Sequence, residues 1–239
     1  MIFIELFISF LIIGAFTFGG GYSMVALIQD EVVRYEAMAV NAFTHSQSIL
    51  PMMEEAYRRA GLEIGQTDYF AVTVGPGSFT GVRIGVSTVK ALAHATCKPC
   101  IAVDALEAMA AGVQPFSGVI CPIQDARAGQ VYGAAFRGGT LERLLPDEPV
   151  KLEDYLEKVS AFGQPILFLG DGMPVHREAI QGILGDRAQF APAHLAFLRP
   201  AAAAFLAWNK REQATDYKSL SPLYLRPPQA ERQKNLRPL

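Results

Sequence analysis

The spacing of apolar residues predicts that strands and helices alternate along the chain from about residue 35 onward. Short β-branched and aromatic runs predict strands at 69–74, 101–103, 119–123, 130–136 and 166–169. Apolar residues that recur every three or four positions predict helices at 44–60, 78–96, 106–111, 152–159, 175–184 and 200–208. Such alternation is typical of an α/β fold with layered sheets.

The first 33 residues follow a different pattern. Residues 2–18 are almost wholly apolar, and their number lies at the lower limit of about 17 for a membrane span. No Lys or Arg precedes the run, so a secretory signal is not indicated. Residues 25–28 and 31–37 could form a hairpin with Gln29-Asp30 as its turn. Because a strand needs only about five or six residues, residues 7–13 could also supply a strand.

Composition and charge describe a globular protein. The chain has 239 residues, of which 51% are hydrophobic and 18% charged, enough to bury a proper core. With a net charge of -2, the chain as a whole has no excess of positive charge that would indicate nucleic-acid binding. One basic cluster worth testing against RNA lies in the last stretch: Arg226, Arg232, Lys234 and Arg237.

The chain carries no recognisable catalytic or metal-binding motif. Three cysteines indicate a reducing compartment without a disulfide framework. Cys97 and Cys100 have a redox or metal spacing, but no second ligand pair follows, so a packing role is favoured. The sequence has no His-x-x-x-His, no His-Glu-x-x-His and no Gly-x-Ser-x-Gly. We therefore expect no catalytic residue, no metal and no cofactor.

A glycine-proline turn, Gly-Pro-Gly at 75–77, joins a predicted buried strand to a predicted helix. Ser78 suits the helix N-cap. A Walker loop would have Lys after Gly81, where Val82 stands, and a dinucleotide loop would have its third glycine at Thr80. The spacing therefore favours a structural turn over a phosphate loop.

Three further features each allow two interpretations. Gly81 and Gly85 leave one helix face nearly bare, and each helical glycine costs about 1 kcal/mol relative to alanine. This predicts close approach by another element, either of the same lobe or of another subunit. Asp125 and Arg127 could be a catalytic carboxylate and an anion clamp, or a local ion pair. Asp171 could meet a ligand, or serve the turn itself.

Residues 75–85, which read Gly-Pro-Gly-Ser-Phe-Thr-Gly-Val-Arg-Ile-Gly, resemble the hallmark loop of the bacterial tRNA threonylcarbamoyladenosine biosynthesis family TsaB. Further stretches resemble the family in the same order, at 44–52, 125–132, 169–172 and 222–232. The matched loop residues are Gly75, Gly77, Ser78, Thr80 and Arg83.

This resemblance implies an actin-like (ASKHA) two-lobe α/β fold. We expect a foreign-looking apolar segment at 1–33 in place of the usual first strand. An N-terminal lobe at 34–113, a C-terminal lobe at 114–220 and a tail at 221–239 would follow.

The resemblance also implies a function. Members support a TsaD-like catalytic subunit which, with a TsaE-like ATPase, transfers a threonylcarbamoyl group to N6 of adenosine 37 in tRNAs that read ANN codons. This chain would be the non-catalytic scaffold, cytoplasmic, a homodimer without TsaD, and in contact with tRNA indirectly. The implied partner interface comprises His45, Ser46, Leu50, Met53, Tyr57, Gly81, Gly85 and Thr88.

Two alternatives remain open. The first 33 residues resemble the start of a chromate transporter, and the Asp-Thr-Ser that normally ends the family's first strand is missing. A fused or misassembled reading frame is favoured, ahead of a membrane-tethered variant or an apolar segment that fills the first-strand position. An independent nucleotide-binding enzyme or peptidase relative is the other alternative, and the missing Asp-Thr-Ser and histidine pair argue against it.

Overall fold

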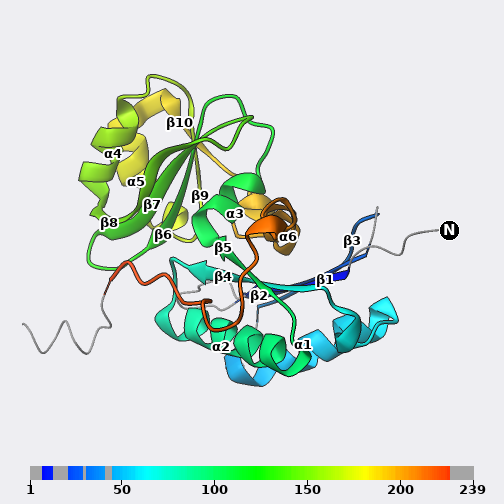
Figure 1. The fold of residues 1–239 in the computed structure, drawn as a ribbon. Coiled ribbons are helices and arrows are strands. Elements are labelled where there is room, and N and C mark those ends of the chain that lie inside the picture. Colours follow the sequence, from blue (N-terminus) through cyan, green and yellow to red (C-terminus); the bar gives the residue numbers. More distant parts are fainter. Residues whose placement is uncertain (1–6, 13–20, 29–30, 41–44, 227–239) are drawn as a thin grey trace, which may run out of the picture.

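The computed structural model describes residues 7–12, 21–28, 31–40 and 45–226, and it is built on two five-stranded sheets (Figure 1). The first, sheet A, has the order β3-β2-β1-β4-β5. β1 is antiparallel to β2 and parallel to β4, β2 is antiparallel to β3, and β4 is parallel to β5. These strands are β1 (Phe7–Ile12), β2 (Gly21–Ile28), β3 (Glu31–Val40), β4 (Tyr69–Gly75) and β5 (Cys100–Asp104).

The apolar N-terminal segment occupies the centre of sheet A. β1 lies between β2 and β4, with Phe10 opposite Ala71. This is the arrangement in which the segment fills the first-strand position. The predicted hairpin is present as β2 and β3, while its turn, 29–30, lies outside the described residues. Within the described part of the chain, no helix is long and apolar enough to cross a membrane.

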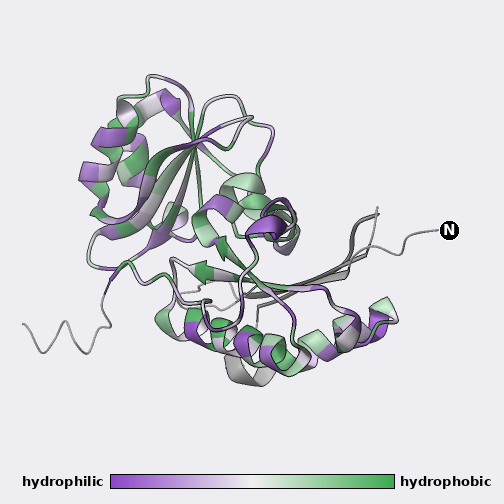
Figure 2. Cartoon of the chain, viewed as in Figure 1, coloured by the Kyte–Doolittle hydropathy of each residue, from purple (hydrophilic) through white to green (hydrophobic). Residues whose placement is uncertain are grey.

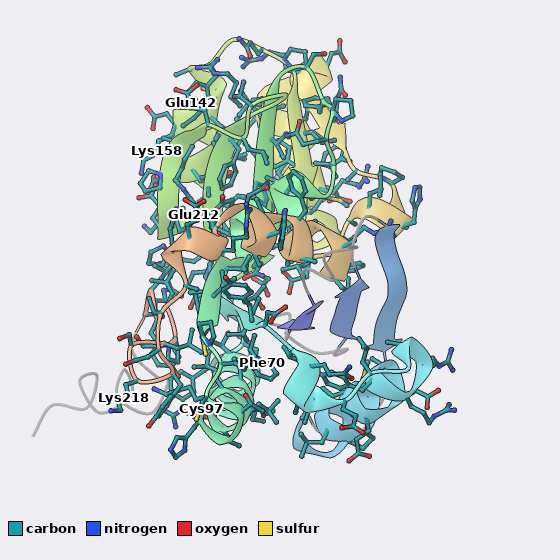
Figure 3. All side chains as sticks on the ribbon, turned by 45° about the vertical axis from the view of Figure 1, so that its right-hand side comes forward. Phe70, Cys97, Glu142, Lys158, Glu212 and Lys218 are labelled. Carbon is teal, nitrogen blue, oxygen red and sulfur yellow. The ribbon has the colours of Figure 1, made fainter. Side chains whose placement is uncertain are left out.

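Two helices, α1 (His45–Ala60) and α2 (Phe79–Thr96), cover one face of sheet A (Figure 1). Their buried residues form a core with Phe70, which Figure 3 labels on β4 near α2, and with Leu220 from the far end of the chain. Pro51 lies inside α1. On the outer face of α1, Arg58 pairs with Glu55 at 2.6 Å.

The second sheet, sheet B, has the order β10-β9-β6-β7-β8. α4 (Leu152–Ser160) and α5 (Gly172–Leu184) pack on one of its faces, around the fully buried Tyr155, whose hydroxyl donates to Ala134 O at 2.6 Å. The strands are β6 (Val119–Asp125), β7 (Gln130–Arg137), β8 (Arg143–Lys151), β9 (Ile166–Leu169) and β10 (Ala188–Phe190). Four 3-10 turns complete the described segments, at Ile64–Gln66, Gly185–Arg187, Ala193–Leu195 and Arg211–Gln213.

Two helices lie between the sheets. α3 (Ala105–Ala111) packs against β6, and α6 (Pro200–Asn209) packs against α3 and against strands of sheet A. The contact is rich in alanine, which lets the backbones approach closely. α3 is coloured mainly as hydrophobic in Figure 2, as expected for a helix covered on both sides. Because α6 contacts both α3 and sheet A, it joins the two halves of the molecule.

A cluster of charged side chains also links the two sheets. Arg143 of β8 lies 3.6 Å from Asp104 at the end of β5 and 3.7 Å from Glu107 of α3, and it pairs with Asp147. Lys210 binds Glu107 at 2.7 Å. Burial raises the pKa of Asp104 to about 7, and the neighbouring Asp147 carboxylate adds to this effect. Asp104 also caps α3 by accepting a hydrogen bond from Glu107 N at 2.7 Å.

Candidate functional site

The chain after α6 returns to sheet A as an extended segment, residues 215–226, which we call the strap. It begins at Thr215, which exchanges two backbone hydrogen bonds of 2.7 and 2.8 Å with Cys100 of β5. Leu220 is buried beside α2, and Lys90 of α2 donates to its carbonyl at 2.9 Å. Leu223 N then donates to Val74 O, at the end of β4, at 2.7 Å.

The strap covers the glycine loop that the sequence singled out. Gly75 has φ of 123°, and a Cβ there would lie 2.7 Å from Leu223 O, closer than real Cβ contacts allow. Ser78 caps α2 as predicted, since its Oγ accepts from Gly81 N at 3.4 Å. The loop glycine thus lets the strap backbone approach the end of β4.

Beyond Leu223 the strap crosses from sheet A to the β6–β7 hairpin. Tyr224 stacks on Phe79 in the first turn of α2, with ring centroids 4.7 Å apart. On α2, the guanidinium of Arg83 lies over the Phe79 ring at 4.4 Å. Arg226 donates to Ala126 O at 3.2 Å and lies 5.9 Å from the Tyr132 ring. Two arginines and three aromatic rings are thus brought together by the strap, and we call them the row: Arg83, Phe79, Tyr224, Arg226 and Tyr132.

Arg226 contacts the turn of this hairpin, which lies in the stretch 125–132 that resembles the TsaB family. Asp125 Oδ1 accepts from Arg127 N at 2.9 Å and lies 3.7 Å from His176 Nε2 of α5. Asp171 Oδ1 accepts from Asp125 N at 3.2 Å. Both carboxylates therefore hold the turn in place, in agreement with the turn interpretation of Asp171.

Glycines flank Asp171 where the backbones come together. Gly170 has φ of 100°, and a Cβ there would lie 2.0 Å from Ile123 O. At Gly172, where α5 begins, a Cβ would lie 3.1 Å from Asp125 N. The predicted Leu-Gly-Asp-Gly strand end is therefore packed directly against the end of β6.

The residues of the predicted partner interface differ in how far they are buried. Leu50 is 48% exposed on α1, and Tyr57 and Thr88 are half-buried. Tyr57 hydrogen-bonds Thr67 at 2.7 Å, and Thr88 donates to Ile84 O at 2.9 Å. The side chains of His45 and Ser46 lie outside the described part. Three members are buried within this chain: Met53, Gly81 and Gly85.

The cysteine pair has separated environments. Cys97 is exposed at the C-cap of α2, with φ of 56°, whereas Cys100 is buried on β5. Burial raises the pKa of the Cys100 thiol to about 11, so it is protonated at neutral pH. Within residues 49–226, no group of three or more His, Cys, Asp or Glu residues is arranged to hold a metal ion.

Comparisons with known proteins show which family the chain belongs to. A family model described as "TsaD: tRNA N6-adenosine threonylcarbamoyltransferase" matches residues 39–234. The chain is 36% identical over 209 residues to the "tRNA threonylcarbamoyladenosine biosynthesis protein TsaB" of Bacillus subtilis, covering 87% of this chain and 90% of that protein. The chain belongs to the TsaB family. The TsaB of Escherichia coli is 38% identical over 95 residues, 39% of this chain and 41% of that protein.

The solved structures agree with the fold expected of the TsaB family. A Pseudomonas aeruginosa protein described as similar to the peptidase YEAZ matches with a TM-score of 0.77 and 23% identity, over 93% of this chain and all of that chain. The predicted actin-like two-lobe α/β fold is confirmed. A chromate-transporter model also matches residues 4–53, so the N-terminal resemblance is real and overlaps the TsaB-like region.

Sequence reasoning placed the family loop and hairpin correctly but missed the strap between them. Its residues have no helical or alternating period, so pattern analysis gave no element there. The available signal was the group of leucines at 220, 223 and 225 around Tyr224.

Proposed function

We propose that this chain is the non-catalytic subunit of a complex that makes N6-threonylcarbamoyladenosine in tRNA, and that it acts by docking on a TsaD-like catalytic subunit. The observation that carries the proposal is the 36% identity to the Bacillus subtilis TsaB over nearly the whole of both chains. The sequence contains no His-x-x-x-His pair, which the metal-binding catalytic relatives carry on a helix, and this supports a scaffold role.

The outer surface of α1 and α2 is the proposed docking site. Leu50 is a large apolar side chain nearly half exposed on this layer, and Met52, Tyr57, Ile84 and Leu92 lie partly buried around the core beneath it. Exposed apolar side chains supported by a rigid core are typical anchors of protein interfaces. The buried Met53, Gly81 and Gly85 would support this surface from within the lobe. A second copy of the chain would compete for the same surface.

Co-purification of the full-length chain with a TsaD-like catalytic subunit tests the proposal. We expect Leu50→Asp to weaken this binding at least tenfold, because it places a charge at the centre of an apolar contact. The matched control is Val175→Asp on α5 of the other lobe, where Val175 is 64% exposed. Both variants should unfold at the wild-type temperature, since neither side chain is buried.

Failure of the wild-type chain to bind the catalytic subunit would refute the proposal. Equal losses of binding in Leu50→Asp and Val175→Asp would instead refute the assignment of the surface to α1 and α2.

A further inference from the structure

The row formed by Arg83, Phe79, Tyr224, Arg226 and Tyr132 places two arginines among three aromatic rings, from the first turns of α2 to β7. It is assembled from three distant parts of the sequence: the start of α2, the strap, and β7. The strap bridges the other two, because Tyr224 contacts α2 while Arg226 contacts the hairpin.

The two arginines of the row carry uncompensated charge. Among the described residues, neither Arg83 nor Arg226 forms an ion pair: Arg83 contacts the Phe79 ring, and Arg226 contacts a backbone carbonyl and the Tyr132 ring. The acidic side chain of the adjoining hairpin, Asp125, is engaged by Arg127 N and faces His176. The row therefore presents positive charge although the whole chain has a net charge of -2.

The aromatic members are positioned for stacking. Tyr224 stacks on Phe79 and is still 40% exposed. Phe79 and Tyr132 are half-buried, so both rings are fixed by the protein and still reach the surface. Fixed aromatic rings beside arginines are the arrangement by which proteins bind single-stranded nucleic acid, with bases stacked on the rings and phosphates on the guanidinium groups.

We propose that this row is a contact surface for a single-stranded RNA loop, in which Tyr224 stacks on a base and Arg83 and Arg226 bind phosphates. The inference rests on the proposed function, which supplies a tRNA to the complex. A duplex fits the row less well, because its bases are already stacked and paired. The chain has no strongly basic field to attract RNA from a distance, so binding should be local and sensitive to salt.

Fluorescence anisotropy of the full-length chain with a labelled RNA stem-loop tests the proposal, with a blunt RNA duplex of equal length for comparison. The stem-loop should bind more tightly than the duplex. Tyr224→Ala should weaken stem-loop binding about tenfold, within the range for one stacked base, whereas Tyr224→Phe should bind as the wild type does. Arg226→Ala should reduce the slope of log affinity against log salt by about 0.7, the contribution of one phosphate contact.

Arg211→Ala is the matched control. Arg211 also lies over an aromatic ring, that of Trp208 at 4.3 Å, but on the segment that follows α6. This variant removes the same charge and the same type of contact, and it should leave stem-loop binding unchanged. Equal losses in Arg211→Ala and Arg226→Ala would overturn the proposal, as would equal affinity for the duplex or no saturable binding by the wild-type chain.

Co-purification with the catalytic subunit separates this proposal from the proposed function. Tyr224→Ala should retain the catalytic subunit while it loses RNA affinity. Loss of the catalytic subunit with unchanged RNA affinity would make the row a protein interface and would overturn the RNA assignment. If the wild-type chain binds the catalytic subunit but does not bind RNA, the RNA surface is refuted and the scaffold function is not.

Discussion

The strap should owe its position mainly to one buried side chain, Leu220. This leucine is 2% exposed and packs into the core formed by α1, α2 and β4. Leu220→Ala removes its outer side-chain carbons from a closed core. Substitutions of this kind cost about 2–5 kcal/mol, depending on how far the cavity collapses. Because the strap is a single extended segment that can relax toward the core, we expect about 3 kcal/mol.

For a chain of this size, each kcal/mol lowers the melting temperature by about 2–4 °C. Leu220→Ala should therefore melt about 6–12 °C below the wild type in a thermal scan followed by circular dichroism. Trypsin provides a local measurement, since Lys218 lies exposed two residues before Leu220 (Figure 3). Cleavage after Lys218 should become faster in the variant, because the strap has lost its buried side chain and opens more often.

The control is Leu223→Ala, three residues further along the strap. Leu223 is 38% exposed, and its contact with β4 is a backbone hydrogen bond that alanine retains. This variant should lose less than about 1 kcal/mol. Equal stability losses in the two variants would refute the reasoning, as would a Leu220→Ala variant within about 0.5 kcal/mol of the wild type.

Two further predictions concern stability. Gly170→Ala should destabilise the chain by at least about 3 kcal/mol in urea unfolding, because its φ is 100° and the new Cβ would lie 2.0 Å from Ile123 O. Gly182→Ala, in α5 with nothing within 4 Å of the new Cβ, should stabilise the chain by up to about 1 kcal/mol; the opposite order would show that the described backbone approach is wrong. The pKa of Asp104 is raised to about 7 from the usual 3.8. Between about pH 4 and 7, the folded chain therefore keeps a proton on this carboxyl group that the unfolded chain has released. Stability from this group should therefore fall as pH rises through that window, and Asp104→Asn, which keeps the cap on Glu107 N, should flatten the curve of unfolding free energy against pH.

The sequence was sufficient to predict most elements of the two lobes. The predicted strand at 69–74, the N-cap at Ser78 and the helix ending at Thr96 match β4 and α2 within one residue. These elements combine a strong apolar period with a defined start and stop. β8 was not predicted, because Arg143–Lys151 contains two prolines and four charged residues, as an edge strand tolerates. β10 is only three residues long, too short for a period to be detected.

The candidate site was less predictable, because its parts meet through contacts between distant residues. The glycine loop could be found from its residues, but nothing local shows that Leu223 would lie against Gly75. The bare face of α2 was predicted to lie close to another element, of the same lobe or of another subunit. Whether that element belonged to the same lobe depended on packing, and in this chain Gly81 and Gly85 are buried.

The closure of sheet A by the end of the chain has a consequence for synthesis on the ribosome. The backbone of Cys100 hydrogen-bonds that of Thr215, and Leu220 completes the core beneath α2. The first lobe therefore cannot finish folding when its own strands and helices emerge, since α6 and the strap are translated after the whole of sheet B. Sheet B has all its strands before residue 191 and is free to fold during elongation. In this protein the lobe that is made first is completed last, and a ribosome that stalls before residue 200 leaves an unfinished apolar sheet exposed to aggregation.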